Sequence, residues 1–214
     1  MMFKQKKLIL VGGGGHCRSV ADVALSANCR IMGIIDPNVD VEVFGAPRLG
    51  DDFDVADVAA RFPEAEFVVT TGHIKSSSLR RHLVKNLEDN GCRIASPIIA
   101  NDAYIGLCVS VGDGSVVMHR AVVNANSSIG TNAIINTGAI VDHDCTIGNF
   151  CHLSTRSVVN GGCRIGNGVF LGSGAVVAQK VTICDDVVIG AGAVVVDDIT
   201  VSGTYLGVPA VKVK

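Results

Sequence analysis

Residues 129–171 read IGTNAI INTGAI VDHDCT IGNFCH LSTRSV VNGGCR IGNGVF L when they are written in blocks of six. Every block begins with Ile, Leu or Val. The same register extends without insertion from Ile99 to Val201, so that eighteen successive sixth positions are aliphatic. A fixed short period of this kind predicts a repeat architecture in which each block is one structural unit.

A second column of small residues runs in the same register, four positions after each aliphatic one. Cys145, Cys151 and Cys163 fall in this column, and Ala or Ser occupies most of its other positions. Because side chains alternate across a strand, the aliphatic and the small column both point inward. We therefore expect these cysteines to be buried packing residues rather than nucleophiles or metal ligands.

The hexad pattern resembles that of the hexapeptide-repeat transferases. This resemblance implies a left-handed parallel β-helix, in which three hexads form one triangular coil of 18 residues. The composition agrees, since the chain has 25 Gly, 4% aromatic residues and no Trp. A core of small and β-branched side chains in thin layers suits such a fold. We assign the β-helix to residues 98–214.

Residues 1–97 show a different pattern, in which strands alternate with helices. This alternation predicts a small parallel sheet of Rossmann-like α/β topology. The expected strands are 7–11, 31–35 and 67–70, with 93–95 as a candidate fourth, and the expected helices are 17–27 and 76–90.

Charge and hydropathy exclude several classes of partner. The net charge of −2 gives no reason to expect nucleic acid, and no apolar run is long enough to span a membrane. The apolar run that follows the basic start is too short for a signal peptide. The eight cysteines form no CxxC pair. We expect a cytoplasmic protein without membrane insertion.

The turn at residues 12–16, Gly-Gly-Gly-Gly-His, lies between the first strand and the first helix. Backbone N–H groups of such a turn can approach a phosphate, and Asp36, which ends the second strand, can hold a ribose or sugar hydroxyl. NAD fits poorly, because Cys17 stands where a dinucleotide motif needs its third glycine. A nucleotide sugar fits better, and a purely structural turn is the alternative.

Two stretches, the turn at 12–16 and Ile135–Cys145 (INTGAIVDHDC), resemble the PglD/NeuD-like sugar acetyltransferases of glycan biosynthesis. That family includes N-acetyltransferases of UDP-4-amino sugars and O-acetyltransferases of sialic acid. The chain departs from its motifs at Cys17, Thr155 and Val211, which replace a usual Gly, Pro and Lys. The site residues that the resemblance implies are catalytic His143, Asp144 and Asn136, acetyl-CoA-binding His152, Ser173 and Ala191, and nucleotide-sugar-binding Gly14, Gly15, His16, Asp36 and Gly72.

Repeat spacing places these residues on the prism. His143 and Asp144 occupy a corner, where the carboxylate can orient the imidazole as a general base. His152 lies on the opposite side of the same coil, on the face that also carries Asn136. A site that uses both histidines must therefore form between subunits, and a cyclic homotrimer would close such sites.

The reaction that we expect is N-acetylation by acetyl-CoA of the 4-amino group of a UDP-, GDP- or dTDP-linked 4-amino-4,6-dideoxy sugar, with direct attack on the thioester. O-acetylation of sialic acid or a related sugar is the nearest alternative. A non-catalytic sugar-nucleotide-binding protein is a distant one. No metal is expected, because the histidine spacings do not match those of β-helical carbonic anhydrases.

Overall fold

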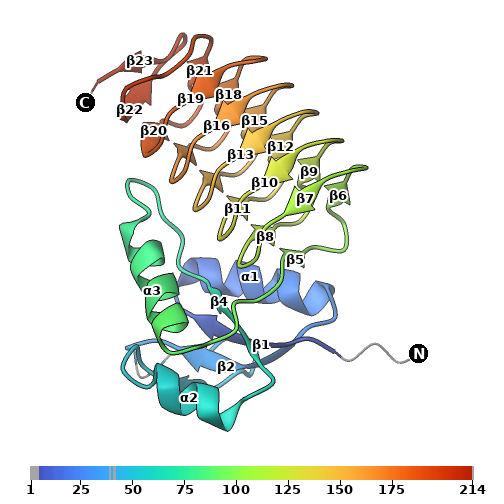
Figure 1. The fold of residues 1–214 in the computed structure, drawn as a ribbon, viewed down its shortest axis with the longest axis vertical. Helices are drawn as coiled ribbons and strands as arrows, with labels where there is room; N and C mark the ends of the chain where they lie inside the picture. The colour runs from blue at the N-terminus through green and yellow to red at the C-terminus, as the bar shows by residue number, and fades with distance from the viewer. Residues whose placement is uncertain (1–4, 39, 41, 214) are drawn as a thin grey trace.

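The computed structural model describes residues 5–38, 40 and 42–213. The N-terminal part holds a parallel four-stranded sheet in the order β3-β2-β1-β4, with helices on both sides (Figure 1). Its strands are β1 (Lys7–Val11), β2 (Arg30–Ile35), β3 (Arg48–Gly50) and β4 (Glu66–Val69). Its helices are α1 (Gly15–Ser26), α2 (Val55–Arg61) and α3 (Ser78–Asp89).

Hydrophobic residues of this sheet point alternately into two cores. Leu8 and Leu10 of β1 pack with α1, whereas Ile9 and Val11 pack with α2 and α3. The α1 core also contains Ile98, Val116 and Met118 from the first coils that follow. The N-terminal part and the repeats therefore share a hydrophobic core at their junction.

The repeats form a left-handed parallel β-helix, whose coils rise as a stack from β5 to β21 in Figure 1. Each hexad contributes a short strand, and each strand pairs with the strand 18 residues later, as Ile135 does with Leu153. Aliphatic and small columns both fill the interior, where Cys145, Cys151 and Cys163 are buried as expected.

The β-helix has three outer faces. The first, here called the covered face, carries the N-terminal part over its early strands. It consists of β5 (Ile98–Ile99), β8 (Val116–Val117), β11 (Ile134–Ile135), β14 (His152–Leu153), β17 (Phe170–Leu171), β20 (Val187–Ile189) and β22 (Gly203–Leu206), with β23 (Val211–Lys212) antiparallel at its edge.

The second, here called the polar face, carries outward residues that are Ser, Thr or Arg. It consists of β7 (Ser110–Val111), β10 (Ser128–Ile129), β13 (Thr146–Ile147), β16 (Arg164–Ile165) and β19 (Thr182–Ile183).

The third, here called the apolar face, consists of β6 (Tyr104–Ile105), β9 (Val122–Val123), β12 (Ile140–Val141), β15 (Val158–Val159), β18 (Val176–Val177) and β21 (Val194–Val195). The first residue of every strand points outward and is apolar. Tyr104 is 58% exposed and Ile140 is 36% exposed. A continuous apolar stripe of this kind is unusual for a surface that faces only water.

Some local expectations were wrong. The first helix starts at Gly15 rather than Cys17, so His16 lies in its first turn. Residues 93–95 add only an isolated bridge between Phe67 and Ile94. The strand β3 and the helix α2 were not predicted. None of the helices in the described part of the chain is long and apolar enough to cross a membrane.

Candidate active site

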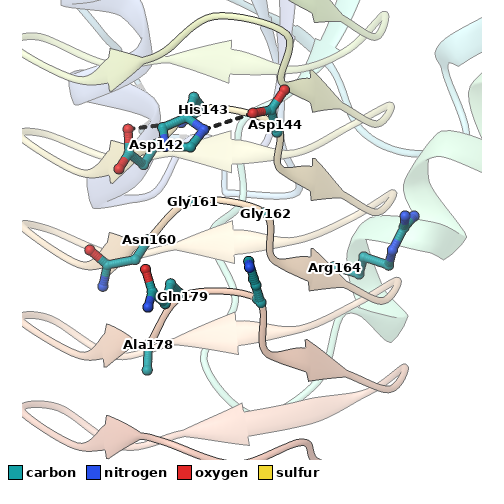
Figure 2. Close-up of a pocket in the computed structure, with 10 residues that line it drawn as sticks. Asp142, His143, Asp144, Asn160, Gly161, Gly162, Arg164, Ala178 and Gln179 are labelled. Carbon is teal, nitrogen blue, oxygen red and sulfur yellow. Dashed lines mark hydrogen bonds and ion pairs between the residues drawn. The ribbon is translucent and has the colours of Figure 1, made fainter.

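His143 lies at the corner between β12 and β13, where Asp144 adopts a left-handed backbone conformation with φ of 58°. This turn brings Asp144 Oδ2 to 2.7 Å from His143 Nδ1 (Figure 2). A carboxylate only accepts hydrogen bonds, so Nδ1 carries the proton and Nε2 is left as the free base. The hydrogen bond to Asp144, followed by the charge of Asp142, raises the pKa of His143.

Two asparagines of the preceding coil hold the carboxylates in place. Asn124 donates to Asp142 Oδ1 over 3.0 Å, and Asn126 donates to Asp144 Oδ1 over 3.3 Å. Asp142 also accepts the backbone N–H of His143 at 2.8 Å. The backbone N–H of His143, followed by Asn124, lowers the pKa of Asp142. The side chain of His143, followed by Asn126, lowers the pKa of Asp144, so both carboxylates are favoured in their ionised form.

The imidazole of His143 extends over Gly161, which stands one coil further on. A Cβ at Gly161 would lie 2.7 Å from His143 Nε2, so only glycine leaves room for the ring. Both residues line a cavity of about 700 Å³ that continues down the corner column (Figure 2). Its other lining residues are Asp142, Asp144, Asn160, Gly162, Arg164, Ala178, Gln179 and Lys180.

His152 has a second, buried environment on the covered face. Its Nδ1 donates to the carbonyl oxygen of His73 at 2.8 Å, so Nε2 must be the acceptor. Asn136 Nδ2 donates to that Nε2 over 3.0 Å, and Asn136 Oδ1 accepts the Thr137 N–H. Burial lowers the pKa of His152 to about 4, which keeps the ring neutral.

A groove of about 650 Å³ starts at His152 and runs along the covered face. The three residues that the sequence predicts for acetyl-CoA, His152, Ser173 and Ala191, all line it. Ser154 and Ser173 join by a 3.1 Å hydrogen bond between their hydroxyls. The remaining lining residues are Ile74, Lys75, Phe170, Gly172, Val188, Gly190, Thr204, Leu206 and Val213. The groove combines an apolar wall with exposed backbone, as a pantetheine arm requires.

The residues predicted for the nucleotide sugar also come together. Gly14 caps α1 without a side-chain partner, and the first turn holds no acidic residue, so the helix start is open to an anion. Asp36 Oδ2 accepts the N–H of Gly13 at 2.5 Å and thereby fixes the turn. A Cβ on Gly72 would lie 3.6 Å from the His16 side chain. The His16 ring is 6.0 Å from that of His152.

His143 does not join this group within one chain. Its cavity follows the corner between the apolar and polar faces, whereas His152 and the groove lie on the covered face. The two cavities share no lining residue. One chain therefore carries two separate halves of the predicted site.

Several residues near the site were not in the predicted set. His73 packs its ring 5.4 Å from that of His152, and Phe170 packs at 5.2 Å. Arg80 of α3 is buried beside them. The sequence did carry a sign that Arg80 is buried, because it shares one helix face with Leu83, Val84 and Leu87. Among the described residues, no group of three or more His, Cys, Asp or Glu side chains could hold a metal ion.

Comparisons with known proteins give consistent matches. The family model of the PglD N-terminal domain matches residues 7–87, and that of the bacterial transferase hexapeptide matches residues 144–179 and 162–197. Comparison with curated sequences gives no match.

Solved structures match over nearly the whole chain. The acetyltransferase domain of PglB from Neisseria gonorrhoeae is 32% identical with a TM-score of 0.89, covering 98% of this chain and 100% of that one. It was also solved with acetyl coenzyme A. PerB from Caulobacter crescentus, in complex with CoA and GDP-perosamine, is 37% identical with a TM-score of 0.88 and covers 95% of both chains. WeeI from Acinetobacter baumannii shares the fold at 24% identity and a TM-score of 0.82, covering 96% of this chain and 99% of that one.

Proposed function

Because the chain belongs to the PglD-like family of hexapeptide-repeat sugar acetyltransferases, we propose that it transfers the acetyl group of acetyl-CoA to a nucleotide-linked 4-amino-4,6-dideoxy sugar. The observation that best supports this proposal is the hydrogen-bonded pair of His143 and Asp144, which leaves His143 Nε2 free at a cavity. N-acetylation is favoured because the Caulobacter relative, a perosamine N-acetyltransferase, was solved with GDP-perosamine, an amino-sugar nucleotide.

In the proposed reaction, the nitrogen of the sugar amine attacks the thioester carbonyl carbon while His143 Nε2 removes a proton from that amine. A C–N bond forms, and the C–S bond breaks when the tetrahedral intermediate collapses. The proton then passes from His143 to the departing thiolate, which leaves as CoA–SH. No enzyme nucleophile is required, and the inward cysteines could not reach the thioester.

The oxyanion of the intermediate needs a hydrogen-bond donor. The backbone N–H of Gly161 donates to no described residue, although the carbonyl of the same residue accepts from Lys180. Gly161 lies directly beside Nε2 of His143. We assign the Gly161 N–H to the developing oxyanion.

The site is proposed to form between the subunits of a homotrimer. One subunit supplies His143 and Asp144, and its neighbour supplies Asn136, His152 and the groove. The separation of the two halves within one chain supports this arrangement. The apolar face supports it further, since packing against other copies would bury its stripe.

Substrate roles follow from the same arrangement. Gly14, Gly15, His16, Asp36 and Gly72 are proposed to hold the nucleotide sugar near His152. Residues Ser173 and Ala191 are proposed to hold the pantetheine arm along the groove. In this arrangement, residues 1–97 bind the acceptor, and residues 98–214 bind the donor together with Ile74 and Lys75 at the groove. A cytoplasmic location remains a prediction.

The test is thiol release from acetyl-CoA against UDP-, GDP- and dTDP-linked 4-amino sugars. His143→Ala should lose about 10²–10⁴-fold in kcat, the usual contribution of a positioned base. His82→Ala, on the exposed side of α3, is the matched control and should retain activity. No turnover with any amino sugar, but turnover with sialic acid, would replace this proposal by O-acetylation. Binding of nucleotide sugars without any acetyl transfer would indicate a non-catalytic protein.

A further inference from the structure

Arg80 is a buried cation that forms no ion pair with any carboxylate in the described part of the chain. It is 1% exposed, and its Nη1 donates to the carbonyl oxygens of Val69, at 3.1 Å, and of Thr71. Its Nη2 donates to the carbonyl of Asn132 at 3.0 Å. Burial lowers the pKa of Arg80 only to about 10, so the guanidinium stays charged at neutral pH. An unpaired buried charge is costly, which calls for an explanation of its placement.

The three acceptors belong to three different segments. Val69 ends β4, Thr71 lies in the loop that follows it, and Asn132 is at a corner of the β-helix. The planar fork of an arginine can hold several acceptors in one fixed geometry. Arg80 therefore fixes the start of this loop against the β-helix.

The same loop sets the state of His152. Two residues after Thr71, the carbonyl of His73 accepts the Nδ1–H of His152. That bond leaves Nε2 as the acceptor for Asn136. Arg80 of α3 and His152 of the candidate active site thus donate to two carbonyls of the same loop, and the backbone of residues 71–73 connects these two hydrogen bonds.

We propose that Arg80 is a positioning residue for acetyl transfer, which holds His152 in its Nδ1–H tautomer and facing Asn136 by fixing the loop at 71–73. The effect on catalysis rests on the proposed function, because it assumes that His152 and Asn136 act in the site. The effect on the tautomer does not.

Arg81 provides a matched control on the same helix. It also bridges α3 to the β-helix, through Asp186 at 3.4 Å and the Phe150 ring at 4.9 Å. It makes no hydrogen bond to the loop at 71–73 in the described structure. Loss of Arg81 should therefore remove a contact between the two parts without breaking a hydrogen bond of the loop at 71–73.

The experiment compares Arg80→Met, Arg80→Lys and Arg81→Met with the wild type. Two quantities are measured on each full-length variant: kcat for acetyl transfer, and the ¹⁵N chemical shifts of His152 at pH 7, which separate protonated from unprotonated ring nitrogens. We expect Arg80→Met to average the two His152 nitrogen signals and to lower kcat about 10–100-fold, as loss of an orienting partner usually does. Arg80→Lys should restore part of the kcat and part of the separation between the two His152 nitrogen signals. Arg81→Met should change neither kcat nor these signals.

Unchanged His152 signals in Arg80→Met would overturn the proposal, even if kcat fell, since the loss would then be structural. Shifted signals with wild-type kcat would overturn the link to transfer. If Arg80→Met does not fold, the Arg80→Lys variant provides the test. It lacks the planar guanidinium, so His152 ¹⁵N signals identical to those of the wild type would exclude the proposed role. Absence of transfer in the wild type would refute the proposed function alone, and the ¹⁵N signals would still test the positioning.

Discussion

Gly161 stands one coil after His143, and a Cβ at this position would lie 2.7 Å from Nε2 and 2.8 Å from Cε1 of the imidazole. The backbone of Gly161 is not in the left-handed region, unlike that of the adjacent Gly162 with φ of 73°. An alanine could therefore adopt the backbone conformation at 161. What it could not do is share the space that the ring occupies.

Gly161→Ala is accordingly expected to displace His143 without unfolding the β-helix. We expect kcat to fall at least tenfold while the thermal unfolding midpoint stays near that of the wild type. Because both changes act on one group, the double variant with His143→Ala should be no slower than His143→Ala alone. Additive losses would show that Gly161 acts independently of the imidazole.

Asp144 should control the pH at which His143 becomes a base. The hydrogen bond that His143 donates to Asp144 is the largest cause of the raised pKa of His143. Since only neutral His143 accepts a proton, kcat/KM should rise with pH through that pKa. In Asp144→Ala, the inflection should move to lower pH and the plateau should fall, because the ring loses its orienting partner. An inflection that does not move would assign the pH dependence to another group.

The repeat was the part of the structure that sequence predicted best. Each hexad specifies its own strand, corner and inward side chains locally, so the register from Ile99 to Val201 determined the stacking without tertiary information. The corner pairing of His143 with Asp144 followed for the same reason. The strand β3 and the helix α2 were missed because they are short and depend on tertiary packing rather than on local periodicity: β3 pairs with β2, and α2 packs against β3.

Arg80 shows where sequence reasoning stops. An arginine on an amphipathic helix is ordinarily solvated, and its burial depends on where α3 docks on the β-helix. His152 occupies an outward position of its strand, yet it is 7% exposed because the N-terminal part covers it. Contacts between the two parts are set by tertiary packing, which no hexad or strand pattern encodes.

Three neighbouring histidines should make stability depend on pH. Burial, reinforced by neighbouring positive charge, lowers the pKa of His16 and His152 to about 4 and that of His73 to about 3. In the unfolded chain these groups titrate near ~6.5, so the unfolded state binds more protons between pH 6.5 and 4. The contribution of the three neutral histidines to the free energy of unfolding is therefore complete above pH 6.5 and is lost as the pH falls toward 4.

Thermal unfolding at a series of pH values tests this dependence. Each pKa unit corresponds to about 1.4 kcal/mol, so the unfolding midpoint should drop markedly between pH 6.5 and 4. His73→Asn removes one of the three groups and should make the drop shallower, whereas His82→Asn should not. If the unfolding midpoint fell equally steeply with pH in the wild type and both variants, the buried histidines would not be the cause of the loss of stability in acid.

The apolar face should control assembly. Ile140→Asp places a charge in the outward stripe, and Thr146→Asp places the same charge on the polar face of the next strand. We expect Ile140→Asp to dissociate trimers into smaller species, as measured by light scattering, and to abolish acetyl transfer. Thr146→Asp should leave the mass unchanged. A wild-type protein that is monomeric and fully active would contradict assembly through this face.

Mixed assembly offers the sharpest test of a site shared between subunits. His143→Ala and His152→Ala should each be inactive alone, because every site in such a homotrimer lacks one histidine. If the two variants are unfolded, mixed and refolded together, each mixed cyclic trimer contains one interface that joins an intact His143 to an intact His152. Activity should therefore return in the mixture to roughly a quarter of the wild-type value, since three in four randomly assembled trimers are mixed and each has one intact site of three. If both histidines instead acted from the same chain, no mixed trimer would contain an intact site, and the mixture would stay as inactive as its parents.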